Sequence, residues 1–286
     1  MDILVCGGSG QLGQSLRKVA EECPHHNFVF TDMPDADITD PETIGKLIAE
    51  VKADVIVNCA AYTAVDKAER EPEEAKRINA AGPESLAGIA VNAGIPLVHI
   101  STDYVFNGTS AAPYKEGDPT GPTGVYGRTN LEGEKAVEVS GARSAKILTV
   151  RIYSEFVNNF VKTMLYMSET MEEINVCAVQ TGTPTYAPDL ARAIVKIIDD
   201  GISGCQIYHF SNEGQASWAD FAEEIFRLAG RSVKVNRTTA AQYPTPANRP
   251  AYSVLDKTKI KASGVEVPQW QVSLAECIDE LKHRGS

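Results

Sequence analysis

Three glycines and an aspartate near the start of the chain have the spacing of a dinucleotide-binding site. Gly7, Gly10 and Gly13 follow a short apolar run, and Asp32 lies nineteen residues after the last of them. Glycines at this spacing let the backbone approach a pyrophosphate closely, and the N-terminus of the following helix attracts its negative charge. A carboxylate about 20 residues further on binds the adenosine ribose hydroxyls. The pattern predicts binding of NAD(H) or NADP(H).

Asp32 also bears on the choice between these two cofactors. Its charge would repel a 2′-phosphate, so it favours NAD(H) without excluding NADP(H). The alternative is an ordinary loop aspartate in solvent. Gln11 and Leu12 lie within the glycine turn and are expected to contact the cofactor, while Asp37 and Ile38 are expected to edge its adenine.

A hydroxyl side chain follows the fourth apolar run of the chain. Thr102 comes directly after the run at 96–101. At the carboxyl end of a central strand it would lie beside the nicotinamide, where a hydroxyl can hold a substrate carbonyl. His99, within the run, is interpreted as a core histidine rather than a catalyst.

A parallel sheet is needed to position these residues. Apolar runs alternate with helical patterns, which is typical of parallel strands joined by crossover helices, and we expect strands at 2–6, 28–31, 54–58, 96–101 and 146–151. Ala60 and Ala61, after the third strand, leave room for a cofactor. Asp40 is expected to cap a helix that starts at Pro41, and a further helix is expected over 73–93. The predicted fold is α/β, a Rossmann-type doubly wound parallel sheet.

The second half of the chain is expected to contribute segments to two domains in turn. We expect a dinucleotide-binding domain at 1–152, to which 186–212 return, and a smaller, discontinuous substrate-binding lobe at 153–185 and 213–286. Asn159 begins a lobe helix that should cover the substrate, and Ser217 should cap the helix from Trp218, a packing anchor. Arg249 is expected to bind a diphosphate because a guanidinium matches phosphate in a bidentate fork. A plain surface arginine is the alternative.

Composition excludes several functional classes. The formal net charge is −11, and no basic run compensates for it, which argues against a nucleic-acid or anionic-membrane surface. The six cysteines show no C-x-x-C spacing, so buried free thiols are expected rather than disulfides or a metal site. With no signal peptide and no apolar stretch of the ~20 residues that a membrane span needs, a soluble cytoplasmic protein is expected.

The order of longer motifs resembles that of an extended short-chain dehydrogenase/reductase, and within that superfamily the dTDP-4-dehydrorhamnose reductase family. The blocks from Asn58 to Glu69 and from Ser101 to Phe106 are far more specific than the glycine pattern. Shorter matches extend the resemblance over nearly the whole chain: Val125-Tyr-Gly-Arg-Thr, Asn158-Asn-Phe, Gly182-Thr-Pro-Thr185 and Arg249-Pro.

The resemblance implies a reaction. A nicotinamide passes hydride to C4 of a thymidine-diphosphate 4-keto-6-deoxyhexose, which yields dTDP-L-rhamnose, and a tyrosine protonates the nascent alkoxide. By motif, Tyr126 is the acid and Thr102 the carbonyl-holding hydroxyl. Tyr62 and Tyr126 join the cofactor site, and Asp103, Tyr104, Asn159 and Arg249 join Thr102 in the substrate site.

One departure from the family falls on its catalytic pair. The family has a lysine four residues after the tyrosine, one helical turn away on the same face, whereas this chain has Asn130. An amide can still hydrogen-bond the nicotinamide ribose, but it cannot stabilise a phenolate as an ammonium does. At about 100° per residue, Arg128 points away from Tyr126, and Lys135 falls on the opposite face.

Other departures cluster near the same site. After Arg151 the chain runs directly to Ile152 and Tyr153, about three residues shorter than the family, and a sugar-contacting aromatic is lost. Val157 and Val179 replace residues that are commonly glycine and acidic.

Two functional classes therefore stay open. One is a nucleotide-sugar reductase, and the other is a non-catalytic dinucleotide-binding regulatory subunit, as the related methionine adenosyltransferase beta subunit is by resemblance. Relatives form homodimers, in some cases with a magnesium ion near the start of the first helix. Gln14 and Ser15 stand there in this chain. Neither is a good hard-cation ligand, so no metal dependence is expected.

Overall fold

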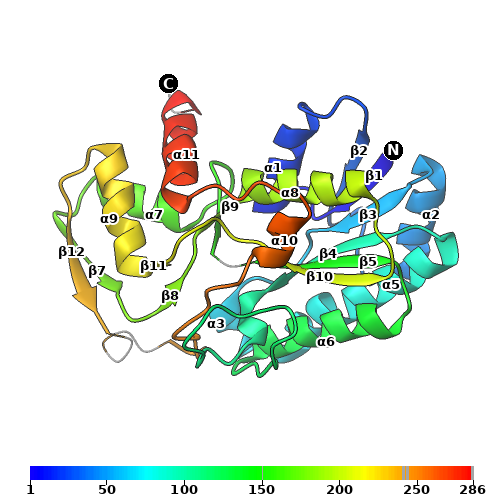
Figure 1. Cartoon of the computed structure of the whole chain (residues 1–286), viewed down its shortest axis with the longest axis horizontal. Helices are drawn as coiled ribbons and strands as arrows, with labels where there is room; N and C mark the ends of the chain where they lie inside the picture. The colour runs from blue at the N-terminus through cyan, green and yellow to red at the C-terminus, as the bar shows by residue number, and fades with distance from the viewer. Residues whose placement is uncertain (150, 240–241, 243–244, 285–286) are drawn as a thin grey trace.

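A six-stranded parallel sheet forms the centre of the larger body (Figure 1). This computed structural model describes residues 1–149, 151–239, 242 and 245–284. The strand order is β10-β5-β4-β3-β1-β2, and every neighbouring pair is parallel. The strands are β1 (Asp2–Cys6), β2 (Asn27–Thr31), β3 (Val55–Asn58), β4 (Leu97–Thr102), β5 (Ser144–Thr149) and β10 (Cys205–His209). The predicted Rossmann-type sheet is confirmed.

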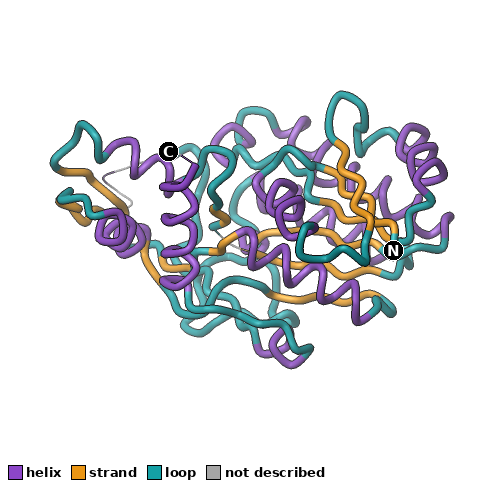
Figure 2. Tube along the Cα trace, turned by 90° about the horizontal axis from the view of Figure 1, so that it is seen from above, coloured by secondary structure: helices purple, strands orange, loops and turns teal. Residues whose placement is uncertain are grey.

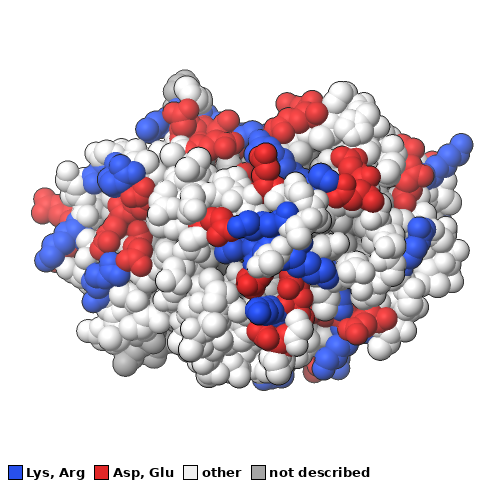
Figure 3. All heavy atoms as spheres, in the orientation of Figure 1, with Lys and Arg blue, Asp and Glu red and all other residues white. Residues whose placement is uncertain are grey.

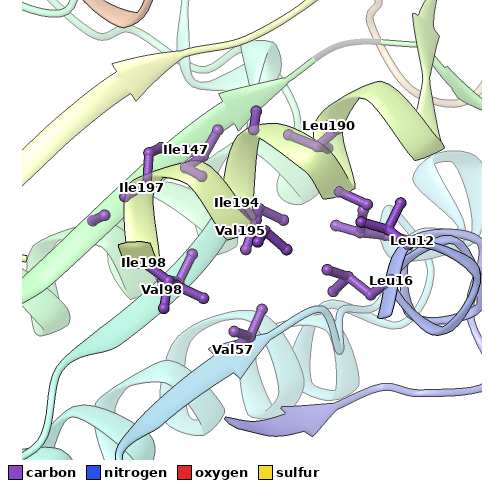
Figure 4. Close-up of a cluster of buried hydrophobic side chains, with 14 of the residues drawn as sticks. Leu12, Leu16, Val57, Val98, Ile147, Leu190, Ile194, Val195, Ile197 and Ile198 are labelled. Atoms are coloured by element: carbon purple, nitrogen blue, oxygen red, sulfur yellow. The ribbon is translucent and has the colours of Figure 1, made fainter. Parts of the chain in front are cut away.

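Helices cover both faces of this sheet (Figure 1). One face carries α1 (Gln11–Ala20) and α8 (Ala187–Asp200), and the other carries α2 (Pro41–Val51), α5 (Gly82–Ala93) and α6 (Val125–Val139). Side chains alternate between the faces because successive strand residues point in opposite directions. Figure 4 shows Val57, Val98 and Ile147 from the strands in one apolar cluster with Leu16 of α1 and Ile194 of α8. This apolar layer holds the carboxyl ends of the strands in position at one edge of the sheet.

The helix predicted over 73–93 contains a π-helical turn. It divides into α4 (Pro72–Lys76), the π segment η1 (Arg77–Ala81) and α5. Asn79 in this turn is buried; its side chain accepts a hydrogen bond from the Tyr62 N–H and donates one to the Tyr62 carbonyl. Single π turns inside α-helices are frequent at functional sites. This one holds the loop after β3 in place.

A smaller body lies at one end of the molecule (Figure 2). Its two parallel strands and three larger helices pack around Phe221, Phe226 and Leu274. The elements are α7 (Phe160–Met167), β7 (Glu173–Cys177), α9 (Trp218–Ala229), β12 (Lys234–Thr238) and α11 (Trp270–Arg284).

Several short elements complete the described chain. They are α3 (Val65–Ala68), η2 (Asp103–Val105), β6 (Ile152–Tyr153), β8 (Thr181–Gly182), β9 (Thr185–Tyr186), β11 (Ala216–Ser217) and α10 (Thr258–Ala262). The expected division into a dinucleotide-binding domain and a substrate lobe stays a prediction.

The predicted helix caps are confirmed. The Asp40 carboxylate accepts hydrogen bonds from two N–H groups at the start of α2, and Pro41 occupies its first position. Ser217 caps α9 in a reciprocal capping box with Asp220. Asn159 caps α7 by accepting from the N–H groups of the first turn.

The strand predicted over 146–151 is wrong at its end. β5 stops at Thr149, residue 150 lies outside the described residues, and Arg151 has a φ of +49°. A side-chain-bearing residue rarely adopts this left-handed conformation. The chain turns sharply here and leaves the sheet.

Burial of the cysteines was only partly predicted. All six are free, Cys6 and Cys277 are buried, and Cys205 is exposed at the edge strand. On the face drawn in Figure 3, acidic and basic side chains are interspersed. Within the described chain, no helix has the length and apolar character of a membrane span.

Candidate active site

A cavity of about 670 Å³ opens at the carboxyl ends of β1, β3, β4 and β5. Its wall joins the glycine turn, the loop after β2, the start of α6 and the first residues beyond β5. Most of the predicted cofactor and substrate residues therefore line one continuous space. A cavity shared in this way is what a reaction between two bound molecules requires.

The glycine turn is close-packed. Gly7 has a φ of +82°, and a Cβ there would come within 2.6 Å of the Ala60 N atom. A Cβ on Gly13 would lie 2.3 Å from the Gly7 carbonyl oxygen. Gly7 and Gly10 line the cavity, whereas Gly13 is not among its lining residues and serves to bring α1 against the turn. Side chains are excluded here by contact with the backbone.

Asp32 sits at the rim of this turn. One carboxylate oxygen accepts a hydrogen bond from the Ser9 N–H at 2.7 Å, and the other accepts from the Met33 N–H at 2.9 Å. Asp32 also lines the cavity. The aspartate thus fixes the loop on which a dinucleotide would rest.

Arg77, which no sequence motif marks, lies beside Asp37 in the same wall. Arg77, from the π segment, lines the cavity with Asp37 and Ile38. Its guanidinium donates to the Asp37 carboxylate at 2.9 Å and to Glu74 at 2.8 Å. Burial opposes the charge of Asp37, but hydrogen bonds from Thr39 and Arg77 leave its pKa lowered. Only the fold brings Arg77 here, forty positions along the chain from Asp37.

Thr102 and Tyr126 both line the cavity and lie within hydrogen-bonding reach of one another. The Thr102 hydroxyl donates to Asp103 at 3.1 Å and accepts from the Tyr104 N–H at 3.2 Å. Burial raises the pKa of Tyr126 to about 12; a hydrogen bond with Thr102 opposes this rise, and the Asp103 charge adds to it. Tyr104 meets the Tyr126 ring edge-on, with centroids 5.4 Å apart.

Asn130 occupies the position beneath Tyr126 on α6. It lines the cavity and is only 3% exposed, and its amide donates to the Tyr126 carbonyl at 2.8 Å. The amide is thus directed to the backbone and carries no charge toward the phenol. Arg128 and Lys135 are exposed, in agreement with the predicted helix geometry.

A buried charged group lies further down the same face of α6. Glu134 accepts a short hydrogen bond from the Ser101 hydroxyl, beside Thr102. Burial raises the pKa of Glu134 to about 7, against the effects of the Ser101 bond and the charge of Lys146. Lys146 is 1% exposed and donates to Glu138 at 3.2 Å. Ser101, like Thr102, lines the cavity, so this cluster supports the end of β4 that faces it.

His99 belongs to the core, as predicted. It is buried, and its Nδ1 lies 3.1 Å from the Asn58 amide nitrogen. Burial, with the Lys146 charge adding to it, lowers the pKa of His99 to about 4. The ring is therefore neutral and accepts the amide hydrogen.

Two further arginines, Arg151 and Arg249, line the cavity. Arg249 forms a bidentate pair with Asp66 at 3.0 and 2.8 Å. Arg151 contacts no carboxylate in this way; it donates to the carbonyls of Ala216 and Gln180, both at 2.7 Å.

Two residues that were expected to contact ligands, Asn159 and Tyr62, do not line the cavity. The Asn159 amide is engaged in capping α7 and in bonds to the Ser154 and Val157 carbonyls, and Asn159 is not among the lining residues. The Tyr62 hydroxyl donates to Glu71 at 2.9 Å, and its ring does not line the cavity either. Spacing alone does not reveal which neighbours of a lining residue turn away. Trp218, expected only as an anchor, does line the cavity.

One cluster in the described chain has the side chains of a metal site. Ligand atoms of His25, His26 and Asp199 all lie within 4.8 Å of one another, away from the cavity. The His26 ring is hydrogen-bonded to Asp199 at 2.7 Å.

The motifs found in the sequence have a full-length match. The family model described as "RmlD substrate binding domain" covers residues 1–283. The chain is 41% identical to the dTDP-4-dehydrorhamnose reductase of Sinorhizobium fredii, with 100% of this chain and 99% of the relative covered. It belongs to the dTDP-4-dehydrorhamnose reductase family. The predicted resemblance is confirmed.

Solved structures of this family have the same architecture. A dTDP-4-dehydrorhamnose reductase from Clostridium acetobutylicum matches with a TM-score of 0.94 and 41% identity, over 99% of this chain and 100% of that one. The enzyme from Bacillus anthracis, in complex with NADP, matches with a TM-score of 0.91 and 34% identity, over 98% and 99%.

Proposed function

We propose that the protein reduces the 4-keto group of dTDP-4-dehydro-6-deoxy-L-hexose (dTDP-4-dehydrorhamnose) to dTDP-L-rhamnose with NAD(H) or NADP(H). The observation that carries this proposal is the convergence of the glycine turn, Thr102 and Tyr126 on one cavity, in a chain of this family. Full-length relatives with this activity in their names support it.

The cavity fits a dinucleotide at one end. Glycines whose Cβ atoms would clash leave the backbone N–H groups at the start of α1 free to approach a pyrophosphate. Asp32 would bind the adenosine ribose, and Asp37 and Ile38 would edge the adenine. When bound, the nicotinamide supplies hydride to the substrate carbon.

The chain's own residues then hold the carbonyl and move the proton. Thr102 directs its hydroxyl toward the carbonyl oxygen, and Tyr126 donates its phenolic hydrogen to the oxygen as charge develops there. A phenol with a pKa near 12 is protonated throughout the neutral range. The proton is therefore present, but its transfer to the substrate oxygen is less favourable than from an ordinary phenol.

Asn130 makes this chain a slower member of the family in our proposal. No cation contributes to the pKa of Tyr126 among the described residues, and the amide beneath it bonds the backbone. The same observation favours the second candidate, a non-catalytic dinucleotide-binding regulatory subunit. Turnover of NADPH with the 4-keto sugar separates the two functions, since the subunit would bind NADPH without consuming it.

The same proposal assigns the two ligands to different segments of the chain. Residues 1–152 with 186–212 would bind the cofactor, and 153–185 with 213–286 would bind the sugar nucleotide. We also expect a homodimer in the cytoplasm that needs no metal and binds no nucleic acid or membrane. Gel filtration with light scattering tests the dimer.

A further inference from the structure

Arg151 stands out among the charged residues of the cavity wall. Its φ of +49° is a conformation that persists in non-glycine residues only where the surroundings impose it, and such residues cluster at ligand sites. The turn directs its side chain along the substrate side of the cavity, next to Gln180 and Trp218.

The guanidinium of Arg151 is held rigidly. Two of its N–H groups donate to the Ala216 and Gln180 carbonyls at 2.7 Å, and its central carbon lies 4.3 Å from the centroid of the Trp218 ring. A guanidinium has five N–H donors, so others remain without an acceptor among the described residues. They are available to a ligand.

The charge of Arg151 is not neutralised by contact, unlike those of the other two arginines of the wall. Arg77 pairs with Asp37 and Glu74, and Arg249 pairs with Asp66 through both carboxylate oxygens. No carboxylate oxygen of the described residues forms an ion pair with Arg151. Asp103 acts on it only at longer range; burial lowers the pKa of Arg151 to about 10, which leaves it charged at neutral pH.

We propose that Arg151 is the main contact for the diphosphate of the nucleotide-sugar substrate. A half-buried, pre-oriented guanidinium without a counter-ion binds a phosphate oxygen pair in a fork, and it need not first give up a carboxylate partner. Arg249 would have to leave Asp66 to do the same. This inference rests on the proposed function and names the residue that recognises its substrate class.

The cofactor also carries a diphosphate, but its place is different. The glycine turn accepts that group at the start of α1, whereas the Arg151 guanidinium is held by the Gln180 and Ala216 carbonyls and the Trp218 ring, all in segments expected to form the substrate lobe. The substrate is therefore the source that the geometry favours.

Binding of dTDP, thymidine and NADPH to the full chain, measured by calorimetry, tests this assignment. Arg151→Gln should weaken dTDP roughly tenfold to a hundredfold, because a charge-assisted hydrogen-bond pair is lost, and leave thymidine and NADPH unchanged. Arg151→Lys, which keeps the charge but not the fork, should recover part of the affinity. Arg227→Gln, far from the cavity, is the matched control and should bind all three as the parent does.

Several results would overturn the inference. They are equal dTDP binding by parent and Arg151→Gln, or weaker NADPH binding in place of weaker dTDP binding. If Arg151→Gln does not fold, Arg151→Lys decides: dTDP affinity equal to the parent's would exclude recognition by the fork. A parent that binds NADPH but neither dTDP nor thymidine would refute the proposed function itself, which is a different outcome from a selective effect of Arg151.

Discussion

Replacing Asn130 with lysine should lower the pKa of Tyr126 and make this phenol a more effective proton donor. Burial raises the pKa of Tyr126 to about 12, roughly two units above the ordinary value near 10. Each unit corresponds to about 1.4 kcal/mol, so burial disfavours the phenolate by about 3 kcal/mol. An ammonium one helical turn away would offset this cost, because a nearby opposite charge stabilises the ionised form.

Only part of that energy reaches the barrier of a proton transfer. We therefore expect Asn130→Lys to raise turnover roughly tenfold to a hundredfold. The assay follows the loss of NADPH absorbance with the dTDP-linked 4-keto sugar. Asn130→Gln, longer than asparagine but uncharged, is the matched control. A spectroscopic pH titration of the phenol, with Tyr126→Phe subtracted, should show the pKa of Tyr126 lowered in the lysine variant.

The electrostatic reasoning fails if parent and Asn130→Lys turn over at the same rate. It also fails if Asn130→Gln gains as much as the lysine variant, since size rather than charge would then be responsible. If both the parent and Asn130→Lys bind NADPH but neither turns over, the shortened segment after Arg151 is the cause.

Three further expectations concern the cofactor, the buried acid and metals. Asp32→Ala should weaken NADH more than NADPH in fluorescence titrations, because the carboxylate is proposed to bind the ribose hydroxyl that NADPH carries as a phosphate; equal losses would refute the role of Asp32. For Glu134, burial raises the pKa from 4.5 to about 7, so its favourable protonation stabilises the fold fully below pH 4.5 and is lost as pH rises through 7. Glu134→Gln keeps an acceptor for Ser101 and should gain up to about 3 kcal/mol over the parent in urea unfolding at pH 8 relative to pH 4.5; a difference that does not change with pH would contradict this. EDTA should leave turnover and oligomeric state unchanged, and restoration by magnesium after a loss would show a metal requirement.

The parts of the molecule that the sequence predicted are those with local causes. The caps at Asp40 and Ser217, the glycine turn and the strand runs depend on neighbouring residues, and they agree with the structure except at the end of the run over 146–151. Helix periodicity alone predicted that Asn130 lies one turn after Tyr126 on the same face of α6.

The parts that escaped prediction depend on long-range packing. Arg77 reaches Asp37 only because the π turn lies over the loop after β2. Trp218 lines the cavity beside Arg151, whose guanidinium lies over the indole ring although the two residues are far apart in the sequence. The left-handed turn at Arg151 follows a strand whose end the apolar pattern placed two residues too late.

The late position of the edge strand β10 in the sequence affects how the sheet forms while the polypeptide is being synthesised. Residues 205–209 pair with β5, which ends at Thr149, so the chain builds α7 and β7 of the smaller body before the sheet is complete. While the chain emerges from the ribosome, the free edge of β5 stays open, and open edges are templates for pairing with other chains. A fragment that stops before residue 205 should therefore aggregate rather than fold as a separate nucleotide-binding unit.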